Sequence, residues 1–309
     1  MSTNESSEAP PPTSLRQRTF HATKWATVMT VTLQLGRLLL YFVLARILGP
    51  DVFGLAARVL AVALIFDMAS EFGFAAALVQ RKNLTRRHID TAFLSNFTFS
   101  VAVAVLGFAG VRLWAWLTSP SEFLDVLQYV MLLPIVFALG HVQRSLLERE
   151  LDYRSITVAL TAGTFVYFVL AVSLALAGWG VWAILVGYTA NYVVVAIFYW
   201  RGSAWRPRLF FGMKEFTDLI AFGFLHAVSQ VVGALTRGLD VLVVGGVLGN
   251  VTAGIFGMSQ RVGGLAVGQV ATVLNGVLFT SFSRIQDDKA KLGSAYLRAT
   301  RYLAVVATA

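Results

Sequence analysis

The stretch that decides the fold runs from Gln34 to Thr85 and reads QLGRLLLYFVLARILGPDVFGLAARVLAVALIFDMASEFGFAAALVQRKNLT. It holds two long apolar segments, which a short turn at residues 48–54 joins, and it ends in a group of positive charges. Each apolar segment has room for the roughly 20 residues with which an α-helix crosses a bilayer core about 30 Å thick. A pair of strands would leave unpaired backbone groups in lipid, so the stretch predicts two membrane-spanning helices.

The composition of the whole chain points to the same class of protein. The chain has 309 residues, of which 57% are hydrophobic and 13% are charged, whereas a soluble domain carries about 25% charged residues. We therefore predict an all-α integral membrane protein. There is no cysteine, which excludes disulfides, thiol catalysis and Cys-based metal sites. The four histidines are scattered without ligand spacing, so the sequence predicts no metal site, and it holds no dinucleotide or Walker motif that would imply a cofactor.

The apolar segments divide the chain into an ordered series of spans. Residues 1–24 are polar and contain three consecutive prolines, which predicts a disordered tail. Residues 25–200 predict a six-helix bundle, residues 201–216 a basic linker, and residues 217–309 an incomplete second bundle. Pro134 lies inside the fourth span and predicts a kink there. The expected spans are 26–47, 53–80, 91–117, 122–143, 155–178, 180–200, 217–248 and 253–282.

A shift of 200 residues reproduces the pattern of the first turn. Leu48-Gly49-Pro50 followed by Gly54 is matched by Leu248-Gly249-Asn250 followed by Gly254. The shared register predicts an internal duplication with two repeats of like orientation. The first repeat would have six helices, and the second only two and a stub of the next. We therefore expect this sequence to be the front part of a longer protein, or a truncated product.

The net charge of +9 reflects the membrane topology of the chain and does not indicate binding to nucleic acid. Most of the 25 basic residues lie in the tail and in alternate loops, and the loops between them are nearly free of charge. Because cytoplasmic loops are enriched in Lys and Arg, this asymmetry predicts a cytoplasmic N-terminus. The basic and aromatic loop at residues 201–216 is typical of an amphipathic segment on the anionic inner leaflet, or of an ordinary linker that sets topology.

Six segments along the chain form a recognisable set: LVQRKNLTRRHIDTAF, LERELDYRSITVAL, GWGVWAILVG, SAWRPRLFF, RGLDVLVVGGVLG and FSRIQDD. They resemble segments of bacterial polysaccharide export flippases, the oligosaccharide-flippase branch of the multidrug/oligosaccharidyl-lipid/polysaccharide exporter superfamily. The resemblance implies two six-helix bundles around a cavity that opens alternately to cytoplasm and periplasm. It also implies a cargo of polyprenyl-diphosphate-linked oligosaccharide for exopolysaccharide, capsule or O-antigen assembly in the bacterial inner membrane.

Arginines inside the spans are the candidates for binding an anionic cargo. Arg37 and Arg237 occupy equivalent positions of the two repeats, and Arg261 lies in the eighth span. Charges at membrane depth are costly and mark a pathway or a buried pair. The planar guanidinium suits phosphate oxygens. We expect these three side chains to line the cavity and hold the diphosphate or acidic sugars.

Carboxylates inside the spans are the candidates for ion or proton coupling. Asp67 and Glu71 are four residues apart and so share a helix face, where two like charges resist ionising together. Asp240 is the third candidate. Two structural interpretations stay open: Arg237 pairs with Asp240, or Arg37 pairs with Asp67. The lone histidines are expected to be unrelated to the site, with His226 a core residue and His141 an interfacial one.

Two other functions remain as alternatives. A polytopic enzyme of polysaccharide assembly would need acidic motifs in sizeable loops, and the loops here are short and basic, so the sequence predicts no enzyme. A cation-coupled multidrug antiporter of the same superfamily would need a site for a cation, and intramembrane arginines favour an anion. The expected partners are the lipid bilayer, a lipid-linked oligosaccharide, and the polymerase and chain-length machinery of the same pathway, with no nucleic acid.

Overall fold

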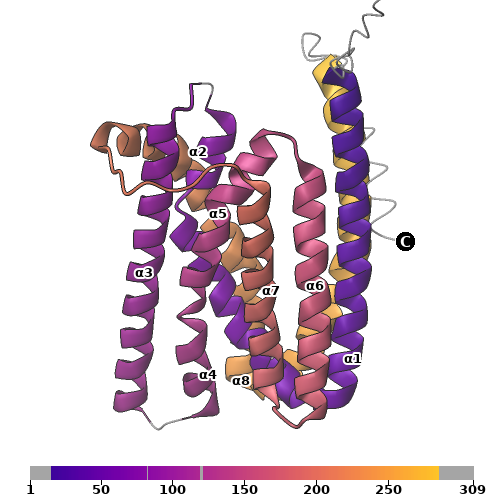
Figure 1. The fold of residues 1–309 in the computed structure, drawn as a ribbon. Helices are drawn as coiled ribbons and strands as arrows, with labels where there is room; N and C mark the ends of the chain where they lie inside the picture. The colour runs from indigo at the N-terminus through magenta and orange to yellow at the C-terminus, as the bar shows by residue number, and fades with distance from the viewer. Residues whose placement is uncertain (1–14, 82, 119–120, 285–309) are drawn as a thin grey trace, which may run out of the picture. The chain divides into compact units, whose positions relative to one another are not determined.

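Helices make up the whole regular structure of the part of the chain that this computed structural model describes, residues 15–81, 83–118 and 121–284 (Figure 1). The side chains of residues 15–33, 35, 37, 222, 261–262 and 264–284 are not described. The expected stub after residue 301 and the first 14 residues of the expected tail lie outside the described residues. The helices are α1 (Leu15–Glu71), α2 (Phe74–Gln80), α3 (Arg86–Leu117), α4 (Glu122–Val130), α5 (Leu133–Arg149), α6 (Tyr153–Leu176), α7 (Val181–Gly202) and α8 (Met213–Arg284).

The lengths and composition of these helices confirm an all-α membrane protein. In the described part of the chain, six helices are long and apolar enough to span a bilayer. Large apolar side chains are exposed along them, such as Leu106, Trp116 and Phe165, which lipid rather than water would solvate. The sequence predicts eight spans. The two numbers differ because α1 and α8 each contain two of the predicted spans, which meet at a non-helical glycine. Helix α1 begins at Leu15, inside the range expected for the tail.

Glycine breaks α1 and α8 at the two turns that the repeat predicts. Gly49 has φ 77° and ψ 169°, and Gly249 has φ 84° and ψ 173°. Only glycine adopts this region without strain. Pro50 then starts the next helical segment, where its missing N–H costs nothing. The same backbone conformation at both positions is what a duplicated hairpin would produce.

The two turns pack against each other through glycine. A methyl group on Gly54 would lie 1.8 Å from the Asn250 carbonyl oxygen, and one on Gly254 would lie 2.2 Å from the Pro50 carbonyl oxygen. The Arg58 side chain donates a hydrogen bond of 2.7 Å to Asn250 Oδ1 across the same contact. These reciprocal contacts align the segment after the first turn with the segment after the second.

A second break divides the span that the sequence predicts as continuous over residues 53–80. Phe72 and Gly73 both have positive φ, at 50° and 74°, and they separate α1 from α2. A neighbour far along the chain requires glycine at this break, because a methyl on Gly73 would lie 2.0 Å from the carbonyl oxygen of Gly223 in α8. Asn96 Nδ2 donates to the Ser70 carbonyl oxygen beside the break at 3.0 Å.

Pro134 marks another division, as the sequence predicts. The fourth span is split into α4 and α5, with Pro134 in the first turn of α5. At the end of α5, Arg149 Nη1 donates to the carbonyl oxygens of Leu78, Val79 and Arg81 at 2.9, 3.1 and 2.7 Å. It thereby satisfies acceptors that the C-terminus of α2 leaves open.

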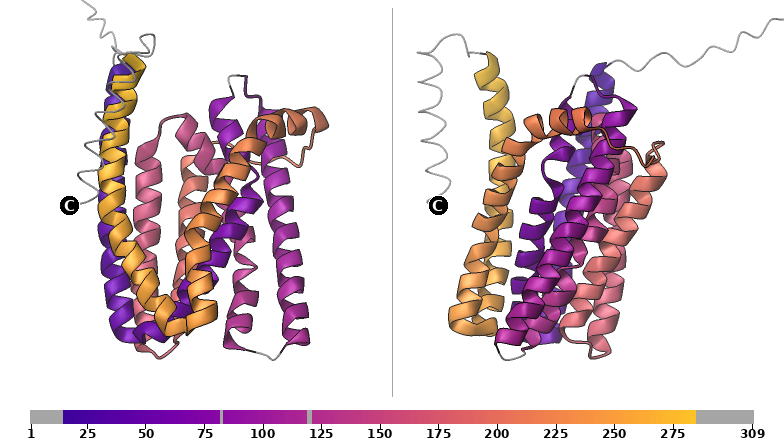
Figure 2. Two further views of the ribbon diagram at one scale, coloured as in Figure 1. Left: turned by 180° about the vertical axis from the view of Figure 1, so that it is seen from behind. Right: turned by 90° about the vertical axis from the view of Figure 1, so that its left-hand side faces the viewer.

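The helices of the first compact unit, residues 1–255, run alongside one another, and α6 packs most closely on α7 (Figures 1 and 2). The segment after α7 crosses the end of the bundle beside α3 before α8 begins (Figure 1). Asp90 Oδ1 accepts from Trp205 Nε1 at 3.1 Å, and Thr91 Oγ1 accepts from the Gly212 amide at 3.1 Å. These bonds tie the predicted linker to α3. The second unit, residues 256–309, contains the remainder of α8. The division into two bundles at residues 201–216 stays a prediction.

Candidate functional site

A polar cavity lies within the first unit, among α1, α2, α5, α7 and the first part of α8. Its volume is about 480 Å³, which is in the range that small ligands occupy. Helix α5 supplies the largest share of its polar wall, and α1, α2, α7 and α8 supply the rest. The polar lining residues are Asp67, Glu71, Gln80, His141, Arg144, Ser145, Glu148, Asn191, Tyr192, Tyr199, His226 and Gln230.

Helical periodicity explains how two apolar helices present polar faces to this cavity. On α5 the polar residues His141, Arg144, Ser145 and Glu148 have spacings of three, four and seven residues from the first, which places them on one face. On α1 the residues at 64, 67, 68 and 71 have the same spacing. The two polar faces line the same cavity, while the rest of each helix is free to pack or to face lipid.

Asp67 and His141 form the centre of the polar wall. Asp67 Oδ1 lies 3.3 Å from His141 Nε2, and their side chains are 7% and 18% exposed. Neither Asp67 Oδ1 nor His141 Nδ1 makes a hydrogen bond. A charge at this depth is costly unless it is paired. The carboxylate and the imidazole therefore form a buried pair with free capacity for a proton or a small cation.

Two further carboxylates flank the pair. Glu71 lines the cavity one helical turn beyond Asp67, at the last residue of α1 before the break. Glu148 accepts a hydrogen bond of 2.8 Å from Arg144 Nε, so its charge is matched on its own helix. The described part of the chain contains no group of three or more His, Asp and Glu side chains arranged to hold a metal ion.

The sequence matches a known family over most of its length. The profile of the family described as "Polysaccharide biosynthesis protein" matches residues 43–308. The chain belongs to this family. Lipopolysaccharide biosynthesis protein WzxC of Escherichia coli K12 is 26% identical over 281 residues, which cover 90% of this chain and 57% of WzxC. Succinoglycan biosynthesis transport protein ExoT of Rhizobium meliloti is 26% identical over 264 residues, which cover 85% of this chain and 53% of ExoT.

This polysaccharide biosynthesis family member also shares its fold with a solved transporter. The structure described as the inward-facing conformation of a multidrug resistance MATE family transporter of the MOP superfamily aligns with a TM-score of 0.60 and 17% identity. The alignment covers 87% of this chain and 69% of that one. At this identity the likeness shows the fold alone. The chain spans little more than half the length of WzxC and ExoT.

The structure separates the predicted site residues of this family member into three groups. Asp67 and Glu71 line the cavity together. Arg237 and Asp240 are exposed and are not among the lining residues, and the Arg237 guanidinium lies over Gly233 of its own helix. The side chains of Arg37 and Arg261 lie outside the described residues, so their predicted roles stay predictions.

Two histidines differ from their sequence interpretation. His141 lies beside Asp67 in the cavity wall rather than at an interface, because α5 turns its polar face toward α1. His226 is exposed and lines the same cavity rather than packing in a core. An interpretation of each histidine by itself did not predict that either lines the cavity. The spacing of polar residues along α5 carries a signal that would have placed His141 at the site.

Proposed function

We propose that this chain belongs to a flippase that moves a polyprenyl-diphosphate-linked oligosaccharide across the bacterial inner membrane by alternating access, and that Asp67, Glu71 and His141 couple this movement to a proton. The observation that carries the coupling role is the buried Asp67–His141 pair at 3.3 Å inside a membrane-spanning bundle. Relatives named for lipopolysaccharide biosynthesis and succinoglycan transport support the class of cargo. Both relatives are proteins of polysaccharide assembly, and ExoT is named as a transport protein, so we propose a transporter rather than an enzyme.

The size and charge of the cavity favour coupling over cargo binding. A volume of about 480 Å³ suits a small ligand, whereas a lipid-linked oligosaccharide is much larger. The wall also holds three carboxylates, Asp67, Glu71 and Glu148, against the single arginine Arg144. An excess of acidic groups attracts protons and cations and repels a diphosphate. The cargo would therefore lie elsewhere in the complete transporter.

The arginines inside the predicted spans are the candidates for binding the cargo. We propose that Arg37, Arg237 and Arg261 contact the diphosphate or acidic sugars in the complete transporter, since guanidinium groups bind phosphate oxygens in a bidentate manner. The exposure of Arg237 in the first unit leaves its side chain available for such a contact. Asp240, one turn further along α8, would set the charge balance around that arginine.

Orientation and partners follow from the same proposal. The positive-inside rule places the N-terminus and the α2–α3 loop in the cytoplasm, where lipid-linked oligosaccharides would be loaded. The polymerase and chain-length machinery that lengthen the exported unit are the proposed protein partners.

The test is export of labelled lipid-linked oligosaccharide in a bacterial host whose own flippase gene has been deleted. Asp67→Asn and Glu71→Gln are compared with Asp51→Asn, which removes an exposed carboxylate from α1 outside the cavity. We expect the two cavity variants to reach the membrane in normal amounts and to lose export, and the Asp51 variant to export normally. Export by Asp67→Asn at the unsubstituted rate, with or without a pH gradient, would refute the coupling role.

One observation favours a second candidate, a cation-coupled drug antiporter. The acidic excess of the cavity would suit a cationic drug as well as a proton. Vesicles that contain the protein distinguish the two functions: a flippase moves labelled lipid-linked sugar, whereas an antiporter extrudes a cationic dye. Dye extrusion that Asp67→Asn abolishes, without any movement of lipid-linked sugar, would favour the antiporter.

A further inference from the structure

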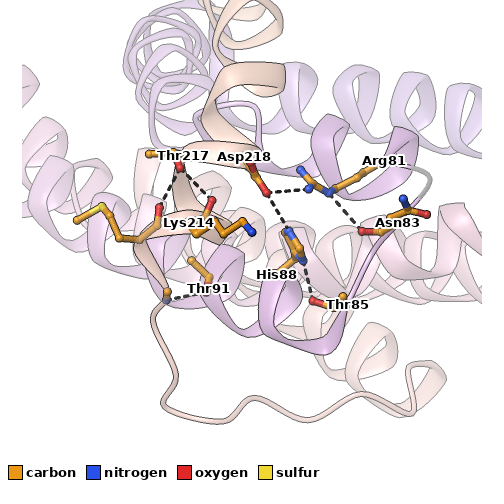
Figure 3. Close-up of polar contacts among 10 residues, drawn as sticks. Arg81, Asn83, Thr85, His88, Thr91, Lys214, Thr217 and Asp218 are labelled. Atoms are coloured by element: carbon orange, nitrogen blue, oxygen red, sulfur yellow. Dashed lines mark hydrogen bonds and ion pairs between the residues drawn. The ribbon is translucent and has the colours of Figure 1, made fainter.

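A second polar hollow lies at the end of the bundle where α2, α3 and α8 meet (Figure 3). Its volume is about 570 Å³ and it is separate from the cavity around Asp67. Four cationic side chains and two carboxylates surround it. The lining residues are Arg81, Asn83, Thr85, Arg86, Arg87, His88, Lys214, Glu215 and Asp218.

Three of the four cationic side chains around this hollow are held in place by neighbours. Arg81 Nη2 lies 2.8 Å from Asp218 Oδ2. Arg86 Nη2 donates to the Arg206 carbonyl oxygen at 3.2 Å, and the Arg87 guanidinium lies 5.3 Å from the centre of the Phe210 ring. A cation that is already positioned loses less conformational entropy when an anion binds.

The hollow also receives the N-terminus of α3, a helix of 32 residues. Thr85 is the N-cap residue, but its side chain makes no capping bond to the backbone, because its hydroxyl contacts His88 Nδ1 at 2.7 Å. The first amides of α3, at Arg86 and Arg87, therefore have no side-chain cap. Open amides and the helix dipole attract an anion to such an end.

His88 provides an independent observation, a buried nitrogen that makes no hydrogen bond. The residue is only 7% exposed, and its Nε2 atom is buried without a hydrogen bond. His88 lines the hollow, and its Nε2 atom lies 3.6 Å from Asp218 Oδ2, within ion-pair range but too far for a hydrogen bond. In Figure 3 the His88 ring and the Arg81 fork both face the Asp218 carboxylate. A buried nitrogen without a hydrogen bond is costly, and a phosphate oxygen in the hollow could supply that bond.

We propose that this hollow binds the phosphate group of a lipid, with Arg81, Arg86, Arg87 and Lys214 as its cationic walls. The site lies apart from the coupling cavity, and the proposal does not depend on the function proposed above. Beside the hollow, the segment before α8 exposes Leu209 and Phe211, and the first residue of α8, Met213, is also exposed. Lipid chains can contact these apolar groups. If the phosphate group of a lipid lies in the hollow, the hydrocarbon chain of that lipid can lie along these apolar side chains.

Asp218 is the internal competitor of such a phosphate. Its carboxylate forms an ion pair with the Arg81 guanidinium. Like other aspartates it is ionised at neutral pH, and the hydrogen bond from Arg81 lowers the pKa of Asp218 further. The four cationic side chains attract a phosphate to the hollow, and the Asp218 carboxylate repels it. Removal of the Asp218 charge should thus strengthen phosphate binding, which a purely structural ion pair would not do.

The test measures the affinity of the purified chain, in a neutral detergent, for short-chain phosphatidylglycerol, phosphatidylcholine, a polyprenyl diphosphate and inorganic pyrophosphate. We expect Arg87→Gln to weaken binding of the anionic lipids by about three- to tenfold, because an exposed charge-assisted contact is of modest strength. Asp218→Asn should strengthen binding by a similar factor. Arg201→Gln is the matched control, an exposed arginine outside the hollow.

The probes identify the source of the phosphate. Tighter binding of phosphatidylglycerol would indicate a bilayer lipid, tighter binding of polyprenyl diphosphate would indicate the cargo lipid, and binding of pyrophosphate alone would indicate a soluble phosphate and so contradict a lipid site. The proposal is also wrong if Arg201→Gln weakens binding as much as Arg87→Gln. It is equally wrong if Asp218→Asn, with an unchanged unfolding temperature, fails to strengthen it.

Discussion

Gly54 and Gly254 face each other across the contact between the two glycine turns, and a methyl group on either would overlap backbone atoms of the opposite segment. The nearest atoms are backbone carbonyl oxygens, which cannot move aside as a flexible side chain would. The close approach therefore requires glycine at both positions. It also brings together the equivalent turns of the sequence repeat, so the duplication has a direct structural counterpart.

The first prediction is that Gly54→Ala destabilises the protein. The added methyl forces the two turns apart, and overpacking of this kind costs about 1–3 kcal/mol. The measurement is the thermal unfolding temperature in detergent. Gly110→Ala is the control, because a methyl on Gly110 in α3 meets nothing within 4 Å. An equal unfolding temperature for the Gly54 variant and the unsubstituted protein would show that the turns do not pack as described.

The second prediction concerns Arg149, which joins α5 to the end of α2. Arg149→Met leaves three carbonyl oxygens without their donor, and an unsatisfied acceptor costs about 1–3 kcal/mol. We expect a lower unfolding temperature and faster tryptic cleavage between α2 and α3. Arg149→Lys should be intermediate, because an ammonium keeps the charge but lacks the planar fork. Arg201→Met, an exposed control, should behave like the unsubstituted protein; a loss as large as that of Arg149→Met would contradict the capping role.

Local sequence signals predict much of the fold. The turns at Gly49 and Gly249 follow from glycine at a helix end, and the division at Pro134 follows from the missing N–H of proline. The break at Gly73 could not be predicted in this way. The break lies against the Gly223 backbone, and this contact exists only when α8 packs beside it. Long-range packing is not recorded in the residues next to the break.

The candidate site was predictable in part for the same reason. Asp67 and Glu71 stand out as charges in an apolar segment, and both line the cavity. Their partner His141 depends on which face α5 turns toward α1, and a single histidine carries no information about that. Arg237 stood out in the same way as Asp67 and yet is exposed outside the cavity. A charge at membrane depth indicates a function or a pair without specifying where the side chain points.

The third prediction concerns the acid side of the stability profile. Hydrogen bonding to Arg81 lowers the pKa of Asp218 in the folded protein. The stabilisation by the ionised carboxylate is therefore fully present above the unfolded pKa of about 3.9. It is lost as the pH falls through the folded pKa. We expect the unfolding temperature of the unsubstituted protein to fall more steeply below about pH 4 than that of Asp218→Asn. Arg81→Gln should flatten the profile in the same way, and identical profiles for all three proteins would refute the linkage.

The fourth prediction tests whether Asp67 and His141 act as one unit. Removal of either side chain leaves the other buried without its ion-pair partner, which costs about 1–3 kcal/mol. We expect this loss to lower transport by roughly five- to hundredfold. Because each residue acts through the other, the double variant Asp67→Asn/His141→Gln should lose no more export than Asp67→Asn alone, a strongly non-additive result. Membrane levels of every variant are measured in the same cells. His226→Gln serves as a control, since His226 lines the cavity but has no ion-pair partner among the described residues. If the effects of the Asp67 and His141 variants on export simply multiply, the two side chains work independently and do not form one coupling unit.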